Sequence, residues 1–341
     1  MHASSINSFK SWLNVIYVEK SNLTHYLTAY ANRIVAVVGY GHECGVSQGL
    51  FCPAPVLALE QLNQDPMVEV WTNQDKVDYL QDGEHRFSLT DQILFGYMVT
   101  PESDGALLEN ASYSTYQNIL KYSSTLGYPH LLRMWNYFPG INKEQKGLER
   151  YKRFCMGRYE AFAERSLPIK STVPAGTAIG TDAGAFTTLF LSSKKPGKHI
   201  ENLRQISAYA YPDLYGPRSP SFSRASLYTW KAGAHLFLAG TASIVGHESC
   251  HPADPGQQAR ETIRNIQTLV RRVECEETLS SDRYATKRLF KVYTRHPSHL
   301  QEIKAQLQKC LGGNDDILFL RGDICRPELL LEVEGIVTYS H

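Results

Sequence analysis

Strand-like and helix-like segments follow one another in the same order twice along the chain. In the second half, a strand-like segment over 227–244 precedes a helical pattern that begins at Asp254. In the first half, a similar segment over 87–99 precedes a helical pattern over 111–126. The helical segments are distinguished from the strand-like ones by apolar residues that recur at helical spacing. The order strand, helix, strand, helix, strand therefore predicts an α+β protein built from two similar mixed-sheet domains, each with helices on one face.

The repeat also predicts where the two domains divide. We expect an N-terminal domain over 1–195 and a C-terminal domain over 196–341. Residues 1–85 contain glycine- and proline-rich stretches and are predicted to form a loop-rich extension of the first domain. The remaining predicted elements are a strand over 131–138, a helix over 143–165, a strand or hairpin over 177–192, a strand over 288–294, a helix over 299–311, and strands over 317–324 and 329–337.

Composition narrows the classes of partner. The 341 residues carry a formal net charge of +1, and lysine and arginine form no longer run than a pair, so nucleic acid is not expected to bind. No run of about 18 apolar residues predicts a membrane span. The N-terminus lacks the pattern of a signal peptide. The seven cysteines are odd in number and scattered, which favours free thiols in the cytoplasm.

The stretch Tyr211–Arg224 is too polar and too rich in proline to form core. Pro212, Pro217 and Pro220 exclude a continuous helix or a central strand. Two arginines and two tyrosines lie among small hydroxyl residues, a mixture that suits a loop gripping a small carboxylate. A solvated surface loop with two ordinary arginines is an equally good interpretation of composition alone.

The segment His247–His251 has the spacing of a zinc-protease motif, but its context argues against that site. Zinc binding of this type needs both histidines on one helical face. Pro252 follows directly, which pushes His251 out of the helical region, and Pro255 prevents the helix from resuming. We therefore predict no metal site here and expect His247 to hold a turn beside a ligand pocket.

Near the C-terminus, Glu332 and Glu334 share one face of a predicted strand. Two positions along a strand separate these carboxylates by about 7 Å. If that face is buried, desolvation and mutual repulsion raise the pKa of one carboxyl, which can then act as a general acid. The alternative is an exposed face on which both carboxylates stay ionised and idle.

Three motifs together resemble the chorismatase family. They are the loop Tyr211–Arg224, the segment Gly240–Ser249 and the segment Cys325–Glu334, and Arg150–Arg158 also matches. The resemblance implies two domains of YjgF/chorismate-mutase-like fold and cleavage of the enolpyruvyl ether of chorismate, with release of pyruvate and without metal or cofactor. Some members hydrolyse chorismate to a dihydroxycyclohexadiene carboxylate, some form 3-hydroxybenzoate, and others form both 3- and 4-hydroxybenzoate for pigment or ubiquinone precursors.

The resemblance also assigns roles to residues of this chain. Glu332 is expected to be the general acid that protonates the enolpyruvyl methylene carbon. The arginines expected to hold the two carboxylates of chorismate compete among themselves, and the motif does not rank them. The residues expected to contact or surround the substrate are Arg158, Tyr211, Arg218, Arg224, Gly240, Thr241 and Ser243.

Two positions point to the product. Benzoate-forming members carry a cysteine seven residues before the catalytic glutamate, as Cys325 stands here, and a glycine that matches Gly240 or its neighbour. The predicted activity is 3-hydroxybenzoate formation, with 4-hydroxybenzoate left open as a further product. Chorismate hydrolysis and a non-catalytic module that binds a small aromatic acid remain alternatives. The expected assembly is a monomer or a small homo-oligomer.

Overall fold

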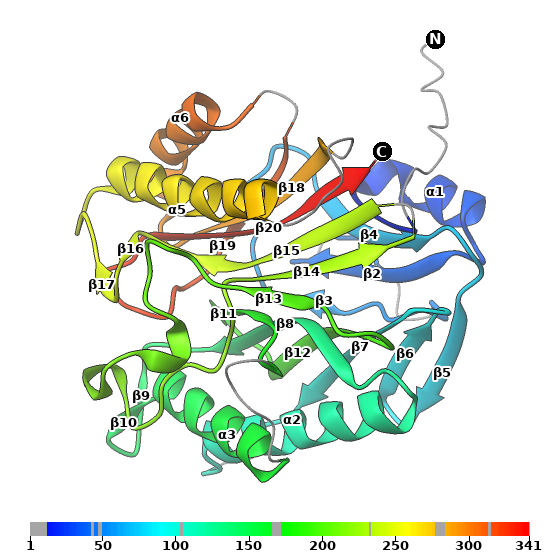
Figure 1. The fold of residues 1–341 in the computed structure, drawn as a ribbon, viewed down its shortest axis with the longest axis horizontal. Helices are drawn as coiled ribbons and strands as arrows, with labels where there is room; N and C mark the ends of the chain where they lie inside the picture. The colour runs from blue at the N-terminus through cyan, green and yellow to red at the C-terminus, as the bar shows by residue number, and fades with distance from the viewer. Residues whose placement is uncertain are drawn as a thin grey trace.

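The computed structural model describes residues 12–41, 44–46, 50–102, 105–165, 172–231, 233–276, 284–312 and 315–340. Two six-stranded mixed sheets face one another, and helices cover the outer face of each (Figure 1). Helices α2 (Leu108–Thr125) and α3 (Arg150–Glu164) pack on the first sheet, and α5 (Pro255–Glu276) and α6 (Leu300–Cys310) pack on the second. The predicted α+β class, with helices on one face of each sheet, is confirmed.

The two large sheets have the same topology, which confirms the predicted repeat. The first has the order β11-β8-β12-β7-β6-β5 and the second the order β19-β18-β20-β15-β14-β13, each with one parallel pair at one edge. The strands of the first sheet are β5 (Asp78–Asp82), β6 (His85–Leu89), β7 (Ile93–Thr100), β8 (His130–Pro139), β11 (Ala175–Thr181) and β12 (Phe186–Ser193). Those of the second are β13 (Lys198–Ile200), β14 (Ala225–Trp230), β15 (Gly233–Thr241), β18 (Tyr284–Thr294), β19 (Asp316–Arg321) and β20 (Leu331–Ser340). In the sequence, all strands of the first sheet precede residue 195, and all strands of the second sheet follow it.

The N-terminal segment is where the prediction was wrong. Residues 13–73 were expected to be loop-rich, but they form a four-stranded sheet of order β1-β4-β2-β3 with α1 on its outer face. Its pairing matches the order β7-β12-β8-β11, including the parallel edge pair, so the segment is a third, shortened copy of the repeated unit. Its elements are β1 (Leu13–Glu19), α1 (Leu23–Ala29), β2 (Ile34–Tyr40), β3 (Val56–Leu57) and β4 (Met67–Asn73).

One hydrophobic cluster joins the three sheets, and a further cluster lies between each sheet and its helices. Trp71 on β4 lies with its ring centroid 5.7 Å from that of Trp135 on β8, and 5.4 Å from that of Phe95 on β7. Phe237 and Ile336 enter the same core from the second large sheet. Burial of such large side chains is the main stabilising contribution to the fold, and here all three sheets share it.

Several element boundaries differ from the sequence prediction. The long helix expected from residue 143 begins at Arg150, because β9 (Glu144–Gln145) and β10 (Leu148–Glu149) form a hairpin whose turn holds Lys146 at φ 49° and Gly147 at φ 75°. The strand-like segments 87–99 and 227–244 are hairpins. Asp254 caps α5 as predicted, since its Oδ1 accepts a hydrogen bond of 2.8 Å from the amide of Gln257.

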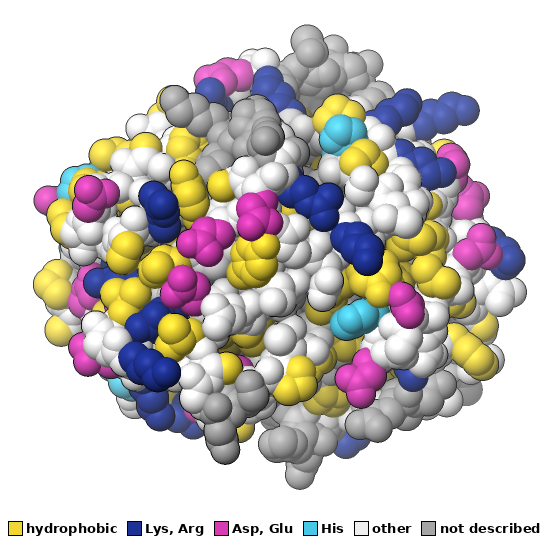
Figure 2. Space-filling model, turned by 90° about the horizontal axis from the view of Figure 1, so that it is seen from below, with side chains coloured by type: hydrophobic (Ala, Val, Ile, Leu, Met, Phe, Trp, Pro, Cys, Tyr) yellow, Lys and Arg dark blue, Asp and Glu magenta, His cyan; other side chains and the backbone are white. Residues whose placement is uncertain are grey.

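Short elements complete the chain. They are the hairpin of β16 (Ile244–Val245) and β17 (Glu248–Ser249), and the 3-10 turns at Lys20–Asn22, Ala208–Ala210, Asp213–Tyr215 and Pro297–His299. Of the helices within the described residues, none combines the length and the apolar character that a membrane span requires. On the face of the molecule seen in Figure 2, acidic and basic side chains are interspersed.

Candidate active site

A cavity of about 250 Å³ lies where the two large sheets meet. Strand β11, at the edge of the first sheet, forms bridges to Ser223 and Asp323 of the C-terminal half, which closes this junction. The cavity is lined from the first sheet and α3 by Tyr151, Arg158, Gly176 and Thr177, and from the C-terminal half by Tyr211, Tyr215, Phe222, Arg224, Gly240, Cys325, Arg326 and Glu332, among others.

Glu332 lies on β20 and projects into this cavity from a buried position. Its side chain is only 5% exposed, and it stands opposite Tyr293 of β18. Burial, followed by the charge of Glu334, raises the pKa of Glu332 to about 8. The predicted combination of desolvation and like-charge repulsion is therefore confirmed, and the alternative of two exposed carboxylates is wrong.

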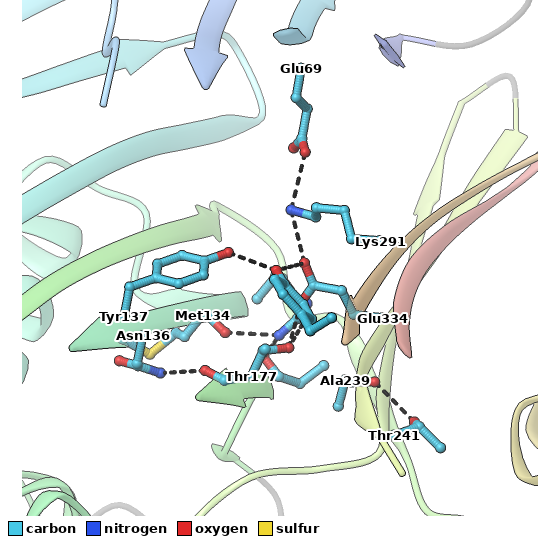
Figure 3. A network of polar contacts seen from close by, with 12 residues as sticks. Glu69, Met134, Asn136, Tyr137, Thr177, Ala239, Thr241, Lys291 and Glu334 are labelled. Atoms are coloured by element: carbon cyan, nitrogen blue, oxygen red, sulfur yellow. Dashed lines mark hydrogen bonds and ion pairs between the residues drawn. The ribbon is translucent and has the colours of Figure 1, made fainter. Parts of the chain in front are cut away.

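Glu334 sits on the same face but in the opposite electrostatic state. Burial alone would raise its pKa, yet the charges of Lys291 and Arg133 hold it below the usual value. Lys291 Nζ lies 2.8 Å from one carboxylate oxygen and Arg133 Nη2 lies 2.5 Å from the other, while Thr177 and Tyr293 donate hydroxyl hydrogen bonds (Figure 3). Glu334 is thus an anion, and its charge keeps the proton on Glu332.

Gly240 allows the Glu332 carboxyl to take its place. The pairing of β15 with β20 shifts register between Leu238 and Thr241, a bulge that turns Gly240 toward the cavity. A Cβ on Gly240 would overlap Glu332 Oε1 and would lie 2.8 Å from its Cδ. The preceding residue, Ala239, is fully buried and does not line the cavity. Of these two adjacent positions, the one that faces the cavity is therefore occupied by glycine.

Arg158 reaches the cavity from α3. Its side chain is 3% exposed, and its guanidinium lies 4.7 Å from the ring centroid of Phe154 and 6.0 Å from that of Phe222. Among the described residues, its buried Nε and Nη2 have no hydrogen-bond partner. A buried cation with unused donors fits a ligand that brings a carboxylate.

Arg224 supplies a second buried guanidinium from the loop before β14. Its Nη2 donates to the hydroxyl of Tyr211 at 2.7 Å and to the carbonyl of Ile206 at 2.9 Å. Within the described part of the chain its Nε has no partner. Arg158, Arg224 and Tyr211, predicted as substrate-binding residues, are therefore brought together with Glu332 and Gly240 at one cavity.

Three predicted residues lie elsewhere. Arg218 is exposed, stacks at 4.6 Å over Tyr159 and does not line the cavity. Thr241 and Ser243 are buried, and their hydroxyls donate to the carbonyls of Ala239 and Cys250, each at 3.0 Å. Both hydroxyls are thus hydrogen-bonded to the backbone at the end of β15, and neither residue lines the cavity.

Cys325 lines the cavity as a neutral thiol. Burial, with a smaller contribution from the charge of Glu332, raises the pKa of Cys325 to about 12. Because the thiolate is the nucleophilic form, this cysteine is unsuited to attack and instead shapes an apolar part of the cavity.

Arg326 and Tyr215 were missed by the sequence analysis. The Arg326 guanidinium lies 4.0 Å from the ring centroid of Tyr215, and it donates to the carbonyl of His247 at 2.9 Å and to Ser249 Oγ at 3.0 Å. Both residues stand inside the motifs Tyr211–Arg224 and Cys325–Glu334, so the sequence does contain a signal for them. Nothing local in the sequence marks Arg133 or Lys291.

The segment His247–His251 is not helical, as predicted: His247 lies in the turn between β16 and β17, and His251 follows β17. His251 has a left-handed φ of 60°, which ends any helical pairing of the two histidines. The His247 carbonyl accepts hydrogen bonds from Tyr215 at 2.7 Å and from Arg326 at 2.9 Å, so the turn braces one wall of the cavity.

Comparison with known proteins gives one consistent family. Residues 69–192 match the family model described as chorismatase FkbO/Hyg5-like, N-terminal. A 3-hydroxybenzoate synthase of Streptomyces hygroscopicus is 31% identical, over 93% of this chain and 97% of its own length. A chorismatase of Streptomyces rapamycinicus is 34% identical, over 87% of this chain and 90% of its own. A chorismatase crystal structure superimposes with a TM-score of 0.86 at 29% identity, over 95% of this chain and 98% of that one. The chain belongs to the chorismatase family.

Proposed function

We propose that this protein converts chorismate to 3-hydroxybenzoate and pyruvate, with Glu332 as the general acid. The observation that carries the proposal is a buried carboxyl with a pKa of about 8, facing a cavity that two buried arginines also line. Such a carboxyl is protonated at neutral pH and can donate a proton. The relative named 3-hydroxybenzoate synthase supports the same reaction.

Chorismate fits the charges of the cavity. It carries two carboxylates, and Arg158 and Arg224 each present buried guanidinium donors that other described residues leave unused. Planar guanidinium groups bind carboxylates through paired hydrogen bonds. With the carboxylates on these arginines, the uncharged enolpyruvyl methylene is the part of the substrate left to face Glu332.

The first chemical step is a proton transfer. Glu332 gives its proton to the methylene carbon, and the enol ether becomes an oxocarbenium ion. The newly formed Glu332 carboxylate then lies beside a developing cation, and this opposite charge stabilises the transition state in a site with little water. Glu334 remains ionised throughout, because Arg133 and Lys291 neutralise it.

The second step decides the product. The ring hydroxyl at C4 attacks C3 and gives its proton to the Glu332 carboxylate, and the C3–oxygen bond breaks to release pyruvate. The resulting arene oxide opens to 3-hydroxybenzoate, so every atom of both products comes from chorismate and no water is consumed. Attack by water on the oxocarbenium ion would instead give the dihydroxy diene. The neutral thiol of Cys325 beside Glu332 supports a dry cavity.

The test is to incubate purified protein with chorismate and identify all products by chromatography and mass. Pyruvate with an equal amount of 3-hydroxybenzoate is the expected result, and the same separation measures any 4-hydroxybenzoate. Glu332→Gln should reduce turnover by about 10²- to 10⁴-fold, the range for loss of a general acid. Formation of the diene would contradict the proposed second step, and untouched chorismate would contradict the activity.

A further inference from the structure

A row of four buried charges of alternating sign lies behind the cavity. Glu69 on β4 lies 3.1 Å from Lys291 on β18, which lies 2.8 Å from Glu334 on β20. The other oxygen of Glu334 lies 2.5 Å from Arg133 on β8. Figure 3 shows Lys291 between the two carboxylates. The four residues come from all three sheets, and each is less than a tenth exposed.

The row is neutral as a whole, with two cations and two anions. Burying each charge costs several kcal/mol, and removing one partner leaves an uncompensated charge. Neither Glu69 nor Lys291 lines the cavity, so substrate binding does not explain why they are charged. Glu69 is firmly held, since the hydroxyl of Tyr40 donates to it at 2.7 Å and the indole of Trp71 at 2.6 Å.

The other groups around the row do not change its charge at neutral pH. Burial raises the pKa of Tyr17, Tyr40, Tyr137 and Tyr293 above the ordinary value, so these phenols stay neutral. The titratable and charged groups that adjoin Glu332 or line the same cavity are Glu334 from β20, Arg133 from β8, Tyr293 from β18, Arg158, Tyr151 and Lys152 from α3, Glu149 from β10, Arg224, Tyr211 and Tyr215 from the loop before β14, and Cys325, Arg326 and Glu328 from the segment before β20.

We propose that Glu69 is a positioning residue that holds the proton on Glu332 by cancelling the charge of Lys291. Arg133, on the other oxygen of Glu334, keeps that carboxylate anionic, so Lys291 balanced by Glu69 adds no net positive charge beside the general acid. The shortened N-terminal repeat thereby acts on the chemistry without touching the substrate. The role in catalysis rests on the proposed function, whereas the effect on the Glu332 carboxyl does not.

The charge balance gives a prediction with a sign. Glu69→Gln leaves the row with one net positive charge, which favours ionised Glu332 and shifts the alkaline limb of kcat about one pH unit downward. Near pH 8, kcat then falls about fivefold while KM changes little, because the arginines that bind the substrate are untouched. The double variant Glu69→Gln/Lys291→Met is neutral again, and its alkaline limb should return to that of the wild type.

The experiment combines pH profiles with infrared titration of the Glu332 carboxyl band, which is identified by its loss in Glu332→Gln. Glu60→Gln is the matched control, since it removes an acid that pairs with Arg321 at 3.6 Å outside the row. The proposal is supported if the alkaline limb of kcat and the midpoint of the Glu332 carboxyl move to lower pH in Glu69→Gln and return to the wild-type values in the double variant. It is overturned if neither moves in Glu69→Gln, or if both move still further in the double variant.

Two further safeguards keep the test decisive. If Glu69→Gln does not fold, the neutral double variant still tests the proposal. A Glu332 carboxyl midpoint in that variant that differs from the wild-type midpoint would contradict the idea that Glu69 acts by cancelling the charge of Lys291. If the wild type does not turn over chorismate, the proposed function fails, yet the infrared midpoints still show whether the row controls Glu332. Packing alone would change stability without moving the midpoint in one variant and restoring it in the other.

Discussion

Two glutamates on one face of β20 hold different protonation states because their neighbours differ. Glu334 has a cation on each oxygen, so its pKa falls below the ordinary value despite burial. Glu332 faces the cavity and the anion of Glu334, so its pKa rises to about 8. Environments that separate the pKa values of paired carboxyls are a recurrent way to obtain an acid at neutral pH.

The raised pKa of Glu332 also makes stability depend on pH. The carboxyl ionises near pH 4.5 in the unfolded chain and near pH 8 in the folded protein. The folded state therefore has its full stability from this group below pH 4.5 and loses it progressively up to pH 8. Glutamine cannot ionise, so in Glu332→Gln the free energy of unfolding should exceed that of the wild type by about 3 to 5 kcal/mol at about pH 9.

Denaturant titrations at several pH values check this prediction. The two proteins should differ least at acid pH and increasingly as the solution becomes alkaline. A constant difference between them would mean that Glu332 ionises in the folded protein at its ordinary pKa.

The Glu332 carboxyl lies so close to the backbone of Gly240 that a side chain at residue 240 would displace it. In Gly240→Ala the new methyl must displace the Glu332 carboxyl, and a displacement of about 1 Å at the reacting group lowers kcat by about 10- to 100-fold. Gly176→Ala is a useful contrast, because its Cβ would lie 3.0 Å from Phe222 and 3.8 Å from Arg158 Nη1. It should raise KM more than it lowers kcat. Steady-state kinetics of both variants measure kcat and KM. Equal losses of kcat would contradict the view that residue 240 affects the acid and residue 176 affects substrate binding.

At the scale of elements, the segment from Cys325 into β20 brings the proposed acid, Glu332, and the Cys325 thiol to the same cavity. Replacing the thiol in Cys325→Ala opens space for water beside Glu332, so the fraction of dihydroxy diene among the products should increase. Chromatography of the products measures that fraction. Cys310→Ala, a half-buried cysteine on α6 away from the cavity, is the control. An unchanged benzoate fraction in the first variant would exclude this role for Cys325.

The alternation of side chains along one strand was enough to predict the shared face of Glu332 and Glu334. It could not predict which carboxyl keeps the proton, because Arg133 and Lys291 come from β8 and β18 and reach the site only through the packing of two sheets. The loop arginines show the same limit. Arg224 was correctly placed at the cavity, whereas Arg218 points away, since the path of a proline-rich loop depends on its tertiary contacts.

At the scale of the whole molecule, the repeat was predictable for the two large sheets and not for the shortened one. Helix periodicity and caps such as Asp254 marked the large units. In the N-terminal unit, β2 is a continuous buried run, Ile34–Tyr40, that lacks alternation, and β3 has only two residues. Its strands are recognisable as a sheet only once they pair with one another and close the shared core.

If the N-terminal unit is part of that core, a large substitution within it should destabilise the entire protein. Trp71→Ala removes a fully buried indole that contacts Phe95 and Trp135, and it should lower the free energy of unfolding by about 3 to 5 kcal/mol in a single transition. Leu80→Ala, at an exposed position on β5, should cost less than about 1 kcal/mol. Denaturant unfolding followed by far-ultraviolet circular dichroism compares the two. A separate early transition in Trp71→Ala, with the rest unchanged, would mean that the N-terminal unit unfolds independently of the two large sheets and that Glu69 can separate from Lys291 while those sheets stay folded.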